Sequence, residues 1–120
     1  MIYNNLYLFW RIGKYCYENR NFYNNVFSRC STLFSYKFGI SNVFSINNIK
    51  IMKNFYCCFP IFFDRLFELS WKHYQQLVVI KSKEERIFYF NVCIFCKINS
   101  DDLEKLVVNK YFDLIKKDKF

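Results

Sequence analysis

The sequence predicts an all-α protein, a compact multi-helix single domain of the helix-turn-helix or winged-helix-like type. Apolar residues recur three and four positions apart along most of the chain, as they do on the buried face of a helix. Gly and Pro together number only three among 120 residues, which argues against turn-rich β-sandwiches and barrels. Hydrophobic residues make up 53% of the chain, which excludes a disordered polymer. We therefore expect residues 1–120 to form one domain.

The first two helices are expected over residues 3–20 and 22–38. Each segment carries apolar residues at helical spacing. Gly39 ends the second helix, because glycine commonly occupies the position just after a helix C-terminus. The apolar residues of the first segment are Leu6, Phe9, Trp10, Gly13, Cys16 and Tyr17, and those of the second are Phe22, Val26, Cys30, Leu33, Phe34 and Phe38.

A third helix is expected to begin after Ser45, a residue type that caps helix N-termini well, and to end before Pro60. The two sides of this helix differ in character. The apolar side carries Ile49, Met52, Phe55, Tyr56 and Phe59, and the polar side carries Asn47, Lys50, Lys53 and Asn54.

The second half of the chain predicts a short amphipathic piece over 61–69 and then a helix over 71–79, which Ser70 caps. The β-branched run Val78–Ile80 is too short to indicate a sheet, although it leaves a small wing hairpin open.

Two further helices are expected after this run. Ser82 and Glu85 have capping-box spacing and open a helix to about residue 97. Asn99 or Ser100 caps the last helix, which ends near residue 117. Acidic residues in its first turn and lysines in its last turn suit the helix dipole.

Positive charge is concentrated in the first half of the chain. Residues 1–59 carry seven Lys or Arg and one acid, a balance of +6, whereas residues 60–120 carry eleven and nine, a balance of +2. An unbalanced positive half favours a polyanionic partner, either nucleic acid or an anionic membrane surface. A merely soluble basic surface is the alternative interpretation.

The six cysteines are expected to be reduced thiols of a cytoplasmic protein. The N-terminus has no secretory signal, and no apolar run approaches the roughly 18 residues of a membrane span. Cys93 and Cys96 have Cys-x-x-Cys spacing and could join Cys57 and Cys58 around zinc. Because Cys93 lies in the middle of a predicted helix, we interpret these cysteines as core-filling or bystander residues, and we expect no metal or other cofactor.

A self-contained active site is not expected. His73 is the single histidine and is interpreted as a helix-start residue bonded to local backbone. The paired carboxylates Glu84-Glu85 and Asp101-Asp102 stand at helix starts, where capping explains them. The two glycines of the chain stand alone, so no glycine-rich phosphate loop is present in the sequence.

The polar side of the third helix is the best functional candidate. Lysine neutralises phosphates and asparagine pairs with adenine in the major groove, as on the recognition helix of a helix-turn-helix protein. A solvated amphipathic face is the alternative. The expected nucleic-acid-binding residues are Asn47, Lys50, Lys53 and Asn54, and the cations that could extend the basic surface are Arg11, Lys14, Arg29 and Lys37.

A series of motifs along residues 6–116 resembles the N-terminal domain of the YhcG-type PD-(D/E)xK nuclease family. The first motifs are Leu8-Phe-Trp-Arg-Ile-Gly-Lys14, Phe38-Gly39, Phe44-Ser45 with Asn48-Ile49, Met52 and Phe55-Tyr56, and Pro60. The later ones are Leu69-Ser-Trp-Lys-His-Tyr74, Lys81-Ser-Lys-Glu-Glu-Arg-Ile-Phe-Tyr89 and a closing helix over Leu103–Tyr111.

This resemblance implies a winged-helix-type DNA-binding module that precedes a nuclease domain in full-length relatives. The chain stops where that nuclease domain would begin, so it is not expected to cut nucleic acid alone. In relatives the segment after the Phe-Ser step is arginine-rich, whereas here it carries Lys50, Lys53 and the apolar Ile46. Lysine lacks the bidentate fork of arginine, so this departure favours weaker or less specific binding.

Two other hypotheses stay open. The chain could be a protein–protein module that docks on a separately encoded nuclease or self-associates through exposed Ile46, Ile51 and Phe120. It could instead be a truncated gene remnant without function, which would explain the missing nuclease half and the lost arginines.

Overall fold

The chain folds into two helical units in a computed structural model, an N-terminal unit of residues 1–64 and a C-terminal unit of residues 65–120. The structure describes residues 5–22, 25–39 and 42–118. Every regular element among these residues is a helix, so the all-α prediction is confirmed. The run Val78–Ile80 follows a helix as a turn and a residue without regular secondary structure, and the described part of the chain contains no hairpin.

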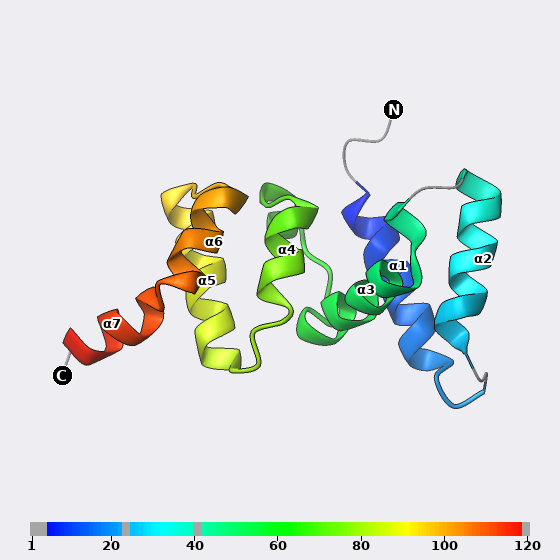
Figure 1. Cartoon of the computed structure of the whole chain (residues 1–120), viewed down its shortest axis with the longest axis horizontal. Coiled ribbons are helices and arrows are strands. Elements are labelled where there is room, and N and C mark those ends of the chain that lie inside the picture. Colours follow the sequence, from blue (N-terminus) through cyan, green and yellow to red (C-terminus); the bar gives the residue numbers. More distant parts are fainter. Residues whose placement is uncertain (1–4, 23–24, 40–41, 119–120) are drawn as a thin grey trace. The chain divides into compact units, whose positions relative to one another are not determined.

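Three α-helices form the N-terminal unit: α1 (Leu6–Glu18), α2 (Val26–Phe38) and α3 (Ile46–Cys58) (Figure 1). A short 3-10 turn, η1 (Asn42–Phe44), leads into α3. The main helix contact joins α1 to α3, and α2 packs against both. The buried side chains of this unit include Leu6, Phe9, Ile12, Cys16, Val26, Cys30, Phe44, Ile49, Met52 and Phe55.

Gly13 lets the backbones of α1 and α3 touch. A Cβ atom at Gly13 would collide with the carbonyl oxygen of Met52 and would lie only 3.0 Å from the backbone nitrogen of Lys53. A backbone carbonyl inside a helix cannot swing aside as the end of a side chain can. The sequence places Gly13 in the buried stripe, and the structure shows that the missing side chain is the reason the two helices can come so close.

Trp10 fastens α1 to the C-terminal end of α3. Its indole Nε1 donates a hydrogen bond of 2.7 Å to the carbonyl oxygen of Phe59, the residue that follows the last turn of α3. The Trp10 ring also packs edge-on against Tyr56 and Phe62, with centroid distances of 5.4 and 5.7 Å. The N–H group and the ring of this one buried side chain therefore both stabilise the contact between α1 and α3.

The limits of α3 agree with the prediction. The Ser45 hydroxyl accepts the N–H of Asn48 at 3.1 Å, and α3 ends two residues before Pro60. Asn48 is itself buried, and its side-chain Nδ2 donates to the Val43 carbonyl oxygen at 2.7 Å. This amide ties η1 to the first turn of α3 and fixes how the chain enters the helix.

The start of α2 differs from the prediction of a helix over 22–38. α2 begins at Val26, because Asn25 adopts a left-handed conformation with φ 63°. Asparagine tolerates that conformation better than most residues, so the chain turns at Asn25 and α2 begins after it. Phe22 then precedes α2 and is 78% exposed, and Leu33 is 56% exposed, so neither joins the core. Gly39, with φ 97°, ends α2 as predicted.

A 3-10 segment, η2 (Asp64–Glu68), leads into the C-terminal unit, which contains α4 (Trp71–Leu77), α5 (Lys83–Cys96), α6 (Ser100–Val108) and α7 (Tyr111–Asp118) (Figure 1). α4 packs against α5 and α6, and α7 packs against the same two helices. Its buried side chains include Leu66, Leu69, Tyr74, Leu77, Tyr89, Cys93, Ile94 and Leu103. The predicted caps Ser70 and Ser82 both accept backbone N–H groups in the first turns of α4 and α5.

The predicted last helix is in fact two helices. Lys110 takes a left-handed conformation with φ 54° between α6 and α7, which breaks the helical hydrogen-bond ladder. The Tyr89 hydroxyl accepts the N–H of Phe112 at 2.9 Å, so a side chain from α5 fixes where α7 begins. At the other end, Asn99 caps α6, because its Oδ1 accepts the N–H of Asp102 at 2.8 Å.

Candidate nucleic-acid interface

The polar side of α3 faces solvent most fully in its N-terminal half. Asn47 and Lys50 are exposed, whereas Lys53 and Asn54 are half-buried. At 3.6 residues per turn, Asn47, Lys50 and Asn54 lie within about 60° of one another around the helix. Lys53 lies about 60° further round from Lys50, at the edge where α3 meets α1. The structure therefore brings three of the four residues together and sets Lys53 at their border.

Lys50 lies against an aromatic ring of α2. Its Nζ is 5.7 Å from the ring centroid of Phe27. A cation over a ring face is attracted to the negative face of the π-system by about 0.5–1 kcal/mol at an exposed site. The contact leaves the Lys50 side chain exposed on the surface where α2 and α3 meet.

Lys53 acts on a buried thiol pair. The Cys16 Sγ of α1 lies 3.4 Å from the Cys30 Sγ of α2, and both side chains are buried. The hydrogen bond to Cys30 and burial raise the pKa of Cys16, and the positive charge of Lys53 opposes that rise. The same hydrogen bond lowers the pKa of Cys30, because it stabilises the acceptor as a thiolate. Lys53 is therefore close enough to this pair for its charge to affect the Cys16 thiol.

An apolar residue borders this polar face. Ile46 is 44% exposed at the start of α3, and Ile51 is half-buried. Around the helix Ile46 lies about 40° from Lys50. Phe120, the third residue of the expected apolar patch, lies outside the described residues.

The other cations of the N-terminal unit gather over aromatic rings. These pairs are Arg11 over Tyr7 at 5.8 Å, Lys14 over Trp10 at 5.7 Å, Arg20 over Tyr17 at 3.8 Å and Lys37 over Phe38 at 6.0 Å. In the C-terminal unit, cations also lie over rings, as Lys116 lies 5.7 Å from the ring centroid of Phe112, and lysines meet carboxylates as well, as Lys105 meets Asp102 at 3.8 Å and Lys116 meets Glu84 at 3.5 Å. Aromatic rings attract cations without cancelling their charge, so the positive excess of the N-terminal unit persists at its surface.

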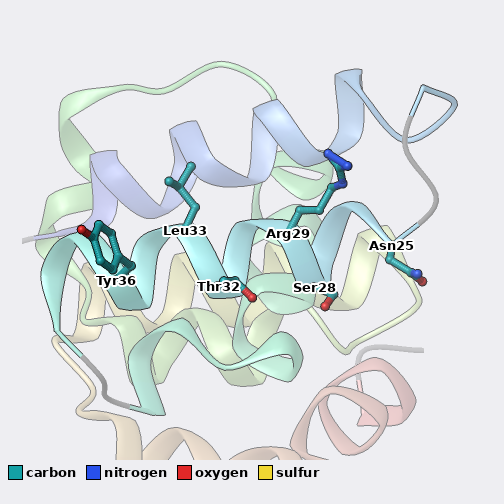
Figure 2. Close-up of a pocket in the computed structure, with 6 residues that line it drawn as sticks. All are labelled: Asn25, Ser28, Arg29, Thr32, Leu33 and Tyr36. Atoms are coloured by element: carbon teal, nitrogen blue, oxygen red, sulfur yellow. The ribbon is translucent and has the colours of Figure 1, made fainter.

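Arg29 belongs to the outer face of α2. It lines an open hollow of about 710 Å³ together with Asn25, Ser28, Thr32, Leu33 and Tyr36. Figure 2 shows Arg29 and Leu33 projecting from one side of the helix and Ser28 and Thr32 from the other. The sequence of α2 contains no acidic residue, and this face carries hydroxyl and guanidinium donors.

His73 is confirmed as a helix-start residue. The Ser70 N–H donates to its Nδ1 at 3.1 Å, and the Ser70 hydroxyl accepts the His73 N–H, which together form a capping box. The His73 Nε2 lies 2.8 Å from the carbonyl oxygen of Ile98. Because Nδ1 accepts, the neutral ring carries its proton on Nε2 and donates it to Ile98. The ring joins α4 to the segment before α6.

The cysteines divide by burial. Cys93 is buried in the core of the C-terminal unit, as expected for a core-filling residue, and burial raises its pKa to about 11. Cys57 and Cys96 are exposed. In the part of the chain that the structure describes, no cluster of three or more His, Cys, Asp or Glu side chains is arranged to hold a metal ion.

Two surface tyrosines of α1 are not among the functional residues that the sequence predicts. Tyr7 and Tyr15 are each 47% exposed, and they flank Arg11 at intervals of four residues on the side of α1 opposite its buried stripe. The available signal was this spacing of rings and a cation around the helix. The abundance of aromatic residues throughout the chain hides this pattern.

These features define an all-helical domain whose basic, aromatic-rich N-terminal unit precedes a unit with closer charge balance. None of the described helices combines the length and apolar character needed to cross a membrane. The chain belongs to the DUF1016 N-terminal domain family, which matches residues 3–114. This is the N-terminal domain of the YhcG-type proteins, so the resemblance in the sequence motifs is confirmed. None of the curated proteins or solved structures matches the chain significantly.

Proposed function

We propose that this domain is a DNA-binding module that contacts duplex DNA through α3 and has no catalytic activity of its own. The observation that carries the proposal is the N-terminal half of α3, a capped helix that presents Asn47 and Lys50 to solvent. It stands in the half of the chain that holds most of the positive charge excess. Counter-ion release makes such a surface attractive to the phosphates of DNA.

Each residue of the α3 face has a distinct role in this proposal. Lys50 and Lys53 neutralise phosphates, and Lys50 is the better exposed of the two. Asn47 and Asn54 reach base edges or phosphates, and an asparagine that pairs with adenine contributes about 1–3 kcal/mol of discrimination. Two lysines without arginine forks favour positioning over strict sequence reading.

The test is fluorescence anisotropy of a labelled duplex against the purified domain across a salt series, with circular dichroism to confirm that the domain is helical. Saturable binding should weaken steeply with salt. The logarithm of the binding constant should fall against the logarithm of the salt concentration with a slope of about −0.9 for each neutralised phosphate. The double variant Lys50→Glu/Lys53→Glu should lose binding. A matched control, Lys81→Glu/Lys83→Glu, makes the same change in net charge with two exposed lysines of the C-terminal unit and should retain it.

Two outcomes contradict the proposal. A well-folded domain that does not bind duplex DNA at low salt has no such function. Equal losses in the α3 variant and in the control would show that net charge alone attracts DNA, with no role for α3.

A protein-docking role is the second candidate, because Ile46 is 44% exposed beside the polar face of α3. Its partner would be a separately encoded nuclease-domain protein or a second copy of this chain. Such an interface should tolerate salt, and Ile46→Asp should disrupt it while Ile46→Val keeps it. Analytical ultracentrifugation of the domain, alone and with a nuclease-domain protein from an adjacent reading frame, measures both forms of association.

A further inference from the structure

We propose that the outer face of α1 binds single-stranded nucleic acid by stacking unpaired bases on Tyr7 and Tyr15. We call this surface the α1 face, and it comprises Tyr7, Arg11, Lys14, Tyr15 and Glu18. This proposal rests on the proposed function in one respect, namely that the N-terminal unit binds nucleic acid. It concerns a different helix and a different form of the ligand, with bases that are not paired.

The α1 face is a hollow built from one helix. Its residues, with Trp10, line a depression of about 480 Å³. The rings of Tyr7 and Tyr15 are each 47% exposed, whereas the opposite side of α1 is buried at Phe9 and Ile12. Exposed aromatic rings beside cations are the recurring platform of proteins that bind single strands.

Packed aromatic rings hold the Tyr7 ring in place. The Tyr7 ring stacks on Trp10 with a centroid distance of 6.0 Å and an interplanar angle of 13°, and it meets Phe62 edge-on at 5.1 Å. Trp10 in turn is fixed by its hydrogen bond to Phe59. A ring that is already held in place loses little conformational entropy when a base stacks on it.

Charge on the α1 face suits a phosphodiester chain. Arg11 lies over Tyr7 and Lys14 over Trp10, so cations stand beside the rings. Arg20, just beyond the helix, lies 3.8 Å from the centroid of Tyr17. Glu18 is the only carboxylate of the face and stands at its C-terminal end, where it would repel phosphate. A single strand would therefore place its phosphates along Arg11 and Lys14.

The spacing of the rings favours unpaired bases over a duplex. Four helical residues rise about 6 Å, so Tyr7, Arg11 and Tyr15 follow one another at about 6 Å intervals. Bases in a stacked strand are only about 3.4 Å apart. Two rings about 12 Å apart along the helix, with a cation between them, suit splayed bases, which stack on aromatic planes. The sequence of α1 contains no Asn or Gln to read base edges.

The test uses the whole chain carrying Trp71→Phe, so that Trp10 is its only tryptophan. The probes are labelled oligothymidylate and oligouridylate of equal length, an abasic oligodeoxynucleotide of that length, and the labelled duplex. Oligothymidylate or oligouridylate should bind and quench Trp10 fluorescence, and the abasic strand, with the same phosphates, should bind at least about ten-fold more weakly. A preference between the first two probes identifies DNA or RNA as the source of the single strand.

Variants locate the binding on α1. Tyr15→Leu should weaken oligothymidylate binding by about ten-fold, because a base–aromatic stack contributes about 1–3 kcal/mol and 1.4 kcal/mol is ten-fold. Tyr15→Phe keeps the ring and should bind normally. The control Tyr36→Leu removes a ring that is 89% exposed on α2 and should change nothing. Glu18→Gln should tighten binding.

The outcomes separate this inference from the duplex-binding proposal. Abasic strands that bind as well as oligothymidylate, or a loss in Tyr36→Leu equal to that in Tyr15→Leu, would overturn the stacking role of α1. A folded protein that binds no single strand would overturn it as well. The same holds if an acidic peptide displaces the strand and binds the α1 face more tightly than the strand does. Duplex binding that depends on Lys50 would survive all of these results, and its own failure would leave single-strand binding intact.

Discussion

Gly13 is the residue that allows the close packing of α1 against α3. Gly13→Ala should lower the free energy of unfolding by about 3 kcal/mol or more, because overpacking costs about 1–3 kcal/mol even where side chains can move, and here a backbone carbonyl stands in the way. Urea unfolding followed by Trp10 fluorescence measures the loss. Thr32→Ala, on the exposed face of α2, should stay within about 0.5 kcal/mol of the parent. A tolerated Gly13→Ala would show that α1 and α3 are further apart than the structure has them.

His73 is a different kind of residue, a buried polar side chain whose two ring nitrogens both take part in hydrogen bonds. His73→Ala should cost about 2 kcal/mol, about 1 for the cap and about 1 for the hydrogen bond to Ile98. His73→Gln keeps a capping-box side chain at the same position and should lose about half as much. Thermal unfolding of both variants measures these losses of stability. Equal losses in the two variants would mean that the cap contributes nothing to stability.

At the scale of single elements, the α3 cap links stability to the proposed DNA contact. Ser45→Ala removes the acceptor of the Asn48 N–H and should cost about 1 kcal/mol. Because fraying begins at Asn47 and Lys50, duplex binding should weaken along with stability. Ser45→Asp restores an acceptor and should recover the melting temperature. The same variant should not recover duplex affinity, since its carboxylate repels phosphate, and full recovery of both would argue against a duplex at this end of α3.

The elements also show what the sequence can and cannot predict. The start and end of α3 follow from Ser45 and Pro60, which act on their own neighbours, so local reasoning found them. The break between α6 and α7 depends on the Tyr89 hydroxyl from α5, which no local pattern indicates.

At the scale of the candidate site, the helical wheel predicts which residues of α3 are polar and exposed. It cannot predict that the charge of Lys53 opposes the rise in the pKa of Cys16, since the Cys16–Cys30 pair comes from α1 and α2.

At the scale of the whole molecule, alkaline pH should destabilise the C-terminal unit. Burial raises the pKa of Cys93 to about 11 and also raises those of Tyr74 and Tyr89. A raised pKa means that the folded state binds the proton more tightly than the unfolded state does. The associated stability is complete below the unfolded pKa, about 8.5 for cysteine, and for Cys93 is lost as pH rises toward 11.

The measurement is urea unfolding at a series of pH values, followed by the fluorescence of Trp71, which lies in α4. The free energy of unfolding should fall from pH 8 upward. Cys93→Ala, although less stable overall, should show a shallower fall, because it no longer has a buried thiol to ionise. An unchanged slope in that variant would assign the effect to the tyrosines.

The buried thiols of each unit provide a way to measure how often that unit opens. Cys16 and Cys30 are hidden in the N-terminal unit and Cys93 in the C-terminal unit, while Cys57 and Cys96 lie in solvent. A thiol-reactive reagent can modify a hidden sulfur only during the moments when its surroundings open. The modification rate at each buried cysteine, divided by the modification rate at an exposed cysteine, therefore reports how often the surrounding unit opens. Time-resolved mass spectrometry of the unaltered chain can follow both units in a single reaction tube.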